Sequence, residues 1–235
     1  MRLSHLRNIN NRKESCLIIG NGPSTKSILN KKLDYDVVIG VNRAMEHFPL
    51  DYWMVMEADA IHYDWLKNTK NKCPLICNKK IAHRLPNKNT IPCWRKYEDH
   101  FNLSNPFIYK HDAKPFIKKG DEALLIGPIN KIGLSVGTVV SQAIHFACIL
   151  NVGKIDIIGF ELFFDKNVDH YYGGQFYRDD IKKHTRDKDG LKLVTVDGKL
   201  TVNYFADSVP FLRKLIKNVR KERELNILSR SLLCE

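Results

Sequence analysis

Two runs of almost purely apolar residues, each closed by a glycine, constrain the fold of this 235-residue chain more than any other feature. The first run is SCLIIG at Ser15–Gly20, and a turn and a short helical stretch to about Leu29 follow it. The second run is KIDIIG at Lys154–Gly159. Strands that are apolar on both faces are typical of parallel sheets, and parallel strands are joined by crossover helices. The pattern therefore predicts an α/β fold with a mostly parallel sheet and helices on both faces.

A strong helical pattern precedes the second run. The segment Ser135–Thr138 opens it, and apolar residues then recur at helical spacing up to Leu150. Gly153 is suited to a left-handed cap at its end. Together with the strand that follows, this helix predicts a Rossmann-like unit. The remaining β-rich runs are Tyr35–Val41, Trp53–Met56, Pro74–Cys77, Ile91–Cys93 and Leu225–Leu228.

The stretch after the second run predicts a lid-like insertion before the last helix. Residues 165–203 are polar and rich in lysine, aspartate and glycine, and they include LVTVDGKLTV. An Asp-Gly pair between two β-rich runs is typical of a tight hairpin turn. Asp207 or Ser208 is expected to cap the last helix, with Pro210 in its first turn and its end near Glu224. No repeat or linker divides the sequence, so we expect one nucleotide-binding domain over residues 1–235.

Composition limits the function classes. The net charge of +12 indicates an anionic partner, but the sequence carries no nucleic-acid-binding signature, so a small-molecule partner is expected instead. No apolar run approaches the roughly 20 residues of a membrane span, and no signal-peptide core precedes the first strand. The six cysteines form no C-x-x-C pair and are interpreted as small apolar residues. We therefore expect a cytoplasmic protein without a transmembrane segment.

Three turns at the expected carboxyl ends of strands or at a helix start are candidate nucleotide sites. Ligands of open parallel sheets bind at that edge, where helix N-termini favour anions. Each turn also has a plain interpretation, a tight turn or a helix cap, because glycine, serine and threonine are favoured there. The candidate residues are Gly20, Asn21, Gly22, Pro23 and Ser24 in the first turn, Asn42 and Arg43 in the second, and Ser135, Val136, Gly137 and Thr138 in the third.

Carboxylates and a histidine provide candidate chemistry at the same edge. Glu57 and Asp59 follow the third expected strand, and Glu161 follows the second apolar run. Such carboxylates hold Mg²⁺ in many phosphate-binding sites, or form salt bridges with nearby lysines. The triplet His170, Tyr171 and Tyr172 lies in the insertion, where a histidine can act as general acid or base and tyrosine hydroxyls can hold phosphate.

Several of these motifs together resemble the bacterial sialyltransferases of glycosyltransferase family 42. The motifs are GNGPS, DVVIGVN, SVGT, GFELFF and ELNILSRSLL. The resemblance implies a glycosyltransferase that takes a nucleotide-sugar donor, such as a CMP-sialic-acid-like one, and needs no metal cofactor. It implies that Asn21, Gly22 and Ser24 line the nucleotide phosphates and that Asn42 contacts the sugar or donor. Ser135 and Gly137 would frame the base or ribose.

The sequence also departs from the family pattern. Phe163 stands where those enzymes have a phosphate-binding tyrosine, and VNYFADS before the last helix lacks their catalytic histidine. We therefore assign the role of base to His170. The motifs are shared with proteins that resemble the archaeal hydroxymethylpterin pyrophosphokinase, which implies an alternative, Mg²⁺-dependent enzyme using Glu57 and Asp59. A non-catalytic nucleotide-binding protein is the third hypothesis. The acceptor is expected to be an anionic small molecule or a glycan, and a homo-oligomer stays open.

Overall fold

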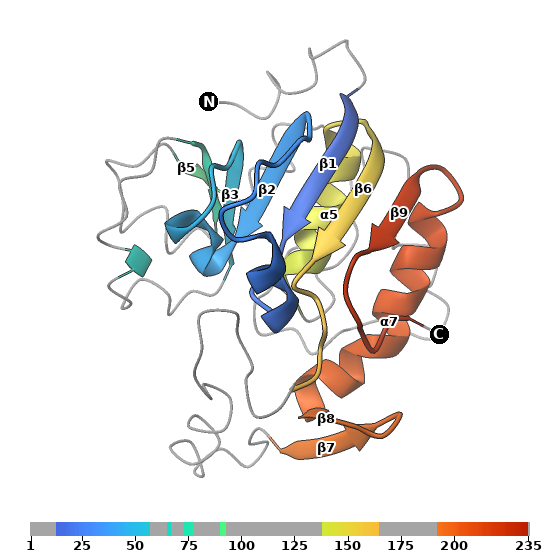
Figure 1. Ribbon diagram of the computed structural model, residues 1–235. Coiled ribbons are helices and arrows are strands. Elements are labelled where there is room, and N and C mark those ends of the chain that lie inside the picture. Colours follow the sequence, from blue (N-terminus) through green and yellow to red (C-terminus); the bar gives the residue numbers. More distant parts are fainter. Residues whose placement is uncertain are drawn as a thin grey trace.

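The computed structural model describes residues 13–56, 65–66, 73–77, 90–92, 138–164 and 192–234. Within them, seven strands form one sheet in the order β5-β4-β3-β2-β1-β6-β9 (Figure 1). Every neighbouring pair in this sheet is parallel, as predicted. The strands are β1 (Lys13–Ile19), β2 (Val37–Val41), β3 (Tyr52–Val55), β4 (Leu75–Cys77), β5 (Thr90–Pro92), β6 (Val152–Ile158) and β9 (Glu224–Ile227).

The order of the strands places a topological switch point between β1 and β6. From β1 the chain builds the sheet outward through β2, β3, β4 and β5, and it then returns to place β6 on the other side of β1. The two central strands are in register with Ile18 opposite Ile157. Loops that leave β1 and β6 therefore start side by side and diverge, which is where parallel sheets bind ligands.

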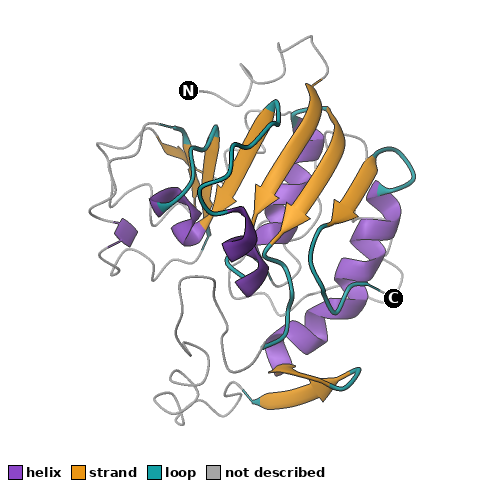
Figure 2. Ribbon diagram, in the orientation of Figure 1, coloured by secondary structure: helices purple, strands orange, loops and turns teal. Residues whose placement is uncertain are grey.

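Helical elements cover both faces of the sheet (Figure 2). On one face lie the helices α5 (Val139–Ile149) and α7 (Asn203–Val219), whose apolar residues share a core with Ile18 and Ile157. On the other face lie the short 3-10 helices η1 (Pro23–Ile28) and η2 (Asn42–Glu46). Buried β1 residues alternate between these two cores because strand side chains point to opposite faces. The predicted fold class is confirmed, with 3-10 helices covering the second face.

The start of β2 differs from the prediction by two residues. The strand begins at Val37 rather than at Tyr35. The Asp36 carboxylate accepts hydrogen bonds from the backbone N–H groups of Glu14 and Ser15, at 2.8 and 3.0 Å. A side chain therefore takes the place of the strand ladder at this end of the β1–β2 pair.

The end of α5 corrects another prediction. Asn151, with a φ of 58°, adopts the left-handed conformation that was assigned to Gly153. Gly153 instead lies within β6, because the strand pairs with β1 from Val152 onward and needs extended backbone there. Asparagine tolerates the left-handed region better than other residues with a Cβ atom. At the other end of α5, Thr138 is the N-cap, and its Oγ1 accepts a hydrogen bond from the Ser141 N–H.

The last helix also begins earlier than predicted. It starts at Asn203, directly after a strand, so neither Asp207 nor Ser208 is its cap and Pro210 lies inside it. The start is fixed by tertiary bonds, since the Asn203 side chain accepts a hydrogen bond from the Lys192 N–H at 2.9 Å. The helix ends at Val219, and the residue expected near its end, Glu224, opens β9.

The predicted hairpin is confirmed as a separate antiparallel pair. Its strands are β7 (Leu193–Val196) and β8 (Lys199–Val202). Asp197 and Gly198 have φ of 49° and 72°, which is the geometry that makes Asp-Gly a favoured turn. The hairpin lies beyond the carboxyl ends of β1 and β6 (Figure 1). Residues 165–191 of the expected insertion lie outside the described residues.

None of the described helices combines the length and the apolar character that a membrane crossing needs.

Candidate functional site

Four polar residues lie within three positions of the ends of four neighbouring strands of the sheet. In the order of the strands they are Asn42 after β2, Asn21 after β1, Glu161 after β6 and Ser229 after β9. The carboxyl ends of parallel strands meet at one edge, so these residues form a row there, which we call the edge row. The sequence predicted the first three. Ser229 was missed, although its position two residues after the last strand was a usable signal.

The glycine-rich turn after β1 is bonded to the loop after β6. The N–H of Gly20 donates to the carbonyl of Ile158 at 2.8 Å, and the N–H of Gly22 donates to the carbonyl of Gly159 at 2.9 Å. A Cβ atom at Gly20 would lie 2.2 Å from the Gly159 carbonyl oxygen. Glycine at this position therefore allows the two loops to approach each other.

The carboxylate of Glu161 lies inside this turn and is only 5% exposed. Its Oε1 accepts a hydrogen bond from the Ser24 N–H at 3.0 Å. In return, the Ser24 hydroxyl accepts one from the Gly159 N–H at 3.0 Å. A Cβ atom at Gly22 would lie 1.6 Å from Glu161 Oε2. The absence of a side chain at Gly22 thus makes room for a carboxylate of the same chain.

These bonds change how the turn can bind a ligand. The N–H groups of Gly20, Gly22 and Ser24 all donate to oxygen atoms of the chain itself, and Pro23 has no N–H to offer. The predicted cradle of N–H groups for a phosphate is therefore largely filled by protein oxygens. Asn21 differs, because its Oδ1 is buried and has no hydrogen-bond partner within the described residues.

The C-terminal segment holds the loop after β6 from one side. The Ser231 hydroxyl donates to the Phe160 carbonyl at 2.7 Å, and the Leu232 N–H donates to the Glu161 carbonyl at 3.0 Å. Ser231 is itself 1% exposed. The backbone of Glu161 is thus fixed independently of the bond that its side chain makes.

The hairpin is also bonded to this loop. The Thr201 hydroxyl donates to the Leu162 carbonyl at 2.5 Å, and the Phe164 N–H donates to the Leu200 carbonyl at 2.9 Å. Leu162 has a φ of 61°, a conformation that is unfavourable for a residue with a Cβ atom. Such strain persists where surrounding contacts over-determine the backbone, and it is concentrated at functional sites.

The second predicted turn carries fewer free groups. Asn42 is in the left-handed region with a φ of 47°, and its carbonyl accepts a hydrogen bond from the Trp53 indole at 2.6 Å. The guanidinium of Arg43 forms an ion pair with Glu46. The backbone carbonyl of Asn42 is therefore already bonded, and Arg43 already has a carboxylate partner.

Several predicted site residues lie outside the described residues. They are Glu57, Asp59, Ser135, Val136, Gly137, His170, Tyr171 and Tyr172. Thr138 is described, and it caps α5. Because the crossover helix α5 runs back to the start of β6, its N-terminus faces the carboxyl edge of the sheet.

Within the described ranges, no three His, Cys, Asp or Glu side chains are grouped so that they could hold a metal ion. Cys73 and Cys77 pack in an apolar cluster with Trp53. Burial raises the pKa of Cys73 to about 11 and that of Cys77 to about 12. Both thiols therefore stay protonated, which supports the interpretation of these cysteines as small apolar residues.

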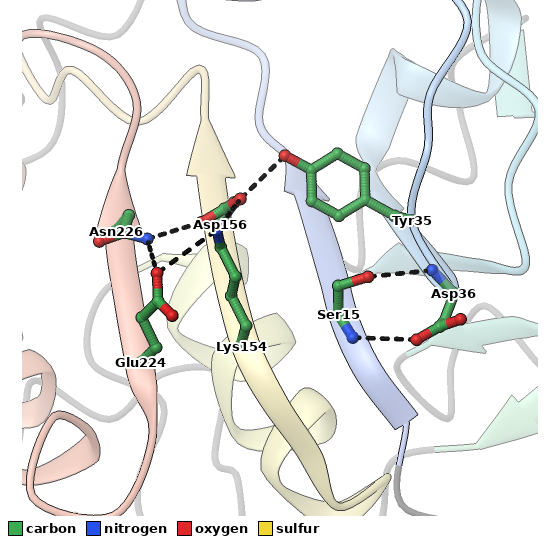
Figure 3. Close-up of polar contacts among 7 residues, drawn as sticks. All are labelled: Ser15, Tyr35, Asp36, Lys154, Asp156, Glu224 and Asn226. Carbon is green, nitrogen blue, oxygen red and sulfur yellow. Dashed lines mark hydrogen bonds and ion pairs between the residues drawn. The ribbon is translucent and has the colours of Figure 1, made fainter.

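A second polar cluster lies within the sheet rather than at its edge (Figure 3). Asp156, 5% exposed, accepts hydrogen bonds from the Tyr35 hydroxyl and from the Asn226 amide, both at 2.9 Å. Burial and the bond to Asp156 raise the pKa of Tyr35 to about 12. Hydrogen bonds from Asn226 and Lys154 lower the pKa of Glu224. Because these groups satisfy one another, we interpret the cluster as structural.

The sequence matches no protein-family model and no curated protein. Among solved structures, the chain is similar to the sialyltransferase CstII from Campylobacter jejuni, solved in complex with a substrate analogue, cytidine-5'-monophosphate. The alignment covers 93% of this chain and 81% of that chain, with 14% sequence identity and a TM-score of 0.47. Similarity of this degree concerns the overall course of the chain alone and carries no information about individual residues.

Proposed function

We propose that this protein is a nucleotide-dependent transferase that binds its nucleotide along the edge row. The observation that carries the proposal is the buried Asn21 Oδ1, which lacks a described partner and lies in the same turn as the Glu161 carboxylate, at the switch point of the sheet. A buried acceptor without a hydrogen bond costs about 1–3 kcal/mol, and a ligand donor would remove that cost.

The chemistry of this corner favours one part of a nucleotide. Asn21 Oδ1 and the Glu161 carboxylate are both acceptors, so they suit hydrogen-bond donors such as ribose hydroxyls or a base amino group. A phosphate offers acceptors, which do not complement these acceptor atoms. We therefore assign the nucleoside to Asn21 and Glu161, in place of the phosphates that the motif resemblance implied there.

The finer form of the proposal is a glycosyltransferase with a CMP-sugar donor and no metal cofactor. An acceptor hydroxyl attacks the anomeric carbon of the sugar while the bond from that carbon to the nucleotide phosphate breaks. His170 takes the proton of the acceptor hydroxyl, and Tyr171 or Tyr172 holds the departing phosphate. Replacing His170 by alanine should then abolish transfer while leaving CMP binding unchanged. Full turnover in that variant would remove His170 from this role.

Nucleotide binding is the first test. Thermal unfolding is followed with CMP, CDP, UDP, GDP and ATP, each with and without Mg²⁺, because a ligand of the folded state raises Tm by mass action. We expect CMP to raise Tm without Mg²⁺. Stabilisation by ATP with Mg²⁺ alone would favour the pyrophosphokinase-like alternative with Glu57 and Asp59. No shift with any nucleotide would overturn the proposal.

A matched pair of variants then localises the nucleotide. Asn21→Ala should weaken CMP binding about fivefold to tenfold, the value of one hydrogen bond of about 1 kcal/mol. Asn218→Ala is the control, because Asn218 lies in the last turn of α7, far from the carboxyl edge. Equal affinities of both variants would exclude Asn21 from the site. Nucleotide binding without transfer to any acceptor would favour the non-catalytic hypothesis.

A further inference from the structure

Lys199 is a half-buried cation at the edge of the proposed site. It is the first residue of β8, and its ammonium lies 4.7 Å from the centroid of the Phe163 ring. Phe163 belongs to the loop that leaves the central strand β6 and carries Glu161 two residues earlier. Lys199 therefore contacts the loop that carries Glu161, and the hairpin to which it belongs lies beyond the carboxyl ends of β1 and β6 (Figure 1).

Among the described residues, no acidic side chain neutralises the charge of Lys199. Its ammonium donates one hydrogen bond, at 3.4 Å, to the Ser231 carbonyl. In the part of the chain that the structure describes, no carboxylate lies within 4.0 Å of it. An ammonium has three donors, and the described residues accept a hydrogen bond from one of them. Arg213 provides a contrast, because its guanidinium pairs with Asp197 and donates to the Leu232 carbonyl.

The surroundings hold this cation in a fixed place. Phe163 lies between two residues whose backbones are bonded to β8, through Thr201 to Leu162 and through Phe164 to Leu200. Ser231, which accepts from Lys199, is itself anchored to Phe160 by its hydroxyl. A cation that is already ordered loses little conformational entropy when it binds an anion, which favours affinity.

We propose that Lys199, seated over Phe163, is the anion subsite of this protein and binds an oxyanion of the substrate, a phosphate or a carboxylate. This inference rests on the proposed function, because the proposed nucleotide substrate is the molecule that carries the oxyanion. The acceptor atoms Asn21 Oδ1 and the Glu161 carboxylate take the donor-rich nucleoside, and the anionic part of the same substrate extends toward the cation on the hairpin. The two parts of the site thus differ in charge, as the neutral nucleoside and the anionic phosphate or carboxylate of the substrate do.

Three lysine variants test the subsite. Lys199→Met removes the charge at nearly constant length, and Lys199→Arg retains it. Lys192→Met is the matched control, because Lys192 is an exposed lysine that directly precedes the same hairpin. The probes are inorganic phosphate, glucuronate as a carboxylate and glucose as a neutral sugar, all titrated at one ionic strength. Binding is read by calorimetry on the full chain.

We expect Lys199→Met to weaken binding of one oxyanion probe about tenfold or more, as for the loss of a hydrogen bond to a charged group. Lys199→Arg and Lys192→Met should stay close to the wild type. If Lys199→Met binds phosphate more weakly, the subsite takes a phosphate. If it binds glucuronate more weakly, the subsite takes a carboxylate. Equal binding by all variants, or no binding of either oxyanion by the wild type, would overturn the inference.

Failure of the inference and failure of the proposed function are distinguishable. If CMP raises Tm and neither oxyanion depends on Lys199, the nucleotide site stands and the subsite falls. If an oxyanion binds through Lys199 and no nucleotide binds, the subsite stands and the proposed function falls. Labelling of lysine amines gives a second readout, because a bound oxyanion should protect Lys199 and leave Lys192 reactive.

Discussion

Glu161 accepts a hydrogen bond from the backbone N–H of Ser24, although 137 residues separate the two in the chain. This bond joins the turn after β1 to the loop after β6 and brings a buried carboxylate to the switch point of the sheet. The Ser24 N–H donates to Glu161, so it is not available to bind a phosphate oxygen of a ligand.

Gly22→Ala should destabilise the protein by about 3 kcal/mol, the upper end of the cost of overpacking. The new Cβ atom would lie 1.6 Å from Glu161 Oε2. Gly22 has an ordinary φ of −67°, so the cost is steric rather than conformational. Urea unfolding of Gly22→Ala, Glu161→Ala and the double variant measures the coupling between the two residues. The double variant should lose about 1 kcal/mol or more less stability than the two single losses added together.

Gly198→Ala is the control for that series. Nothing lies within 4 Å of a Cβ atom at Gly198, but its φ is 72°. Only backbone strain should contribute there, at about 1–2 kcal/mol. Strict additivity of Gly22→Ala and Glu161→Ala would show that the two residues do not meet as described.

Ser229→Ala should leave stability almost unchanged and weaken nucleotide binding. The Ser229 hydroxyl oxygen is buried, and within the described residues it has no hydrogen-bond partner, so its removal costs the folded chain little. Because the proposed nucleotide site follows the edge row as far as Ser229, the ligand loses one hydrogen bond, which corresponds to about a fivefold weaker affinity. Chemical denaturation and CMP titration of the same sample separate the two effects. A large loss of stability with unchanged affinity would make Ser229 a structural residue.

Tyr35→Phe should make the free energy of unfolding less dependent on pH in the alkaline range. The folded protein holds the pKa of Tyr35 at about 12, against 10.0 for the free side chain, because of burial and the bond to Asp156. Between these values the folded state binds more protons than the unfolded state, so stability is present below pH 10 and is lost as pH rises toward 12. Urea midpoints measured over this range should fall more steeply for the wild type. Parallel curves for both proteins would contradict the assignment.

Cysteine labelling should distinguish the exposed Cys234 from the buried thiols Cys16 and Cys77. Burial raises the pKa of Cys77 to about 12 and that of Cys16 further, and both side chains are fully buried. The thiolate is the reactive form, so a thiol reagent at neutral pH should modify the exposed Cys234 before Cys16 or Cys77. Mass spectrometry with and without denaturant locates the label, and Cys234→Ser is the control. Rapid modification of Cys16 in the native protein would be inconsistent with the described core.

Local patterns predicted much of the fold. The strands were found because a buried parallel strand is a short, continuous apolar run that needs no partner to be visible in the sequence. The hairpin was found because Asp197 and Gly198 are suited to a turn in which both residues have positive φ. The start of the last helix was predicted too far along the chain. The observed start depends on the hydrogen bond between Asn203 and Lys192, and local capping preferences do not predict that bond.

The sequence by itself therefore determined the parallel sheet, the positions of its strands and the presence of a glycine-rich turn at the carboxyl edge. Tertiary structure alone decided what that turn contacts. Gly22 and Ser24 have the composition of an anion-binding turn, but Glu161 is placed against them by the pairing of β1 with β6. Likewise, Lys199 lies over Phe163 only because β8 is bonded to the loop after β6. The physical reason is that backbone conformation depends on neighbours in sequence, whereas the partner of each polar group depends on neighbours in space.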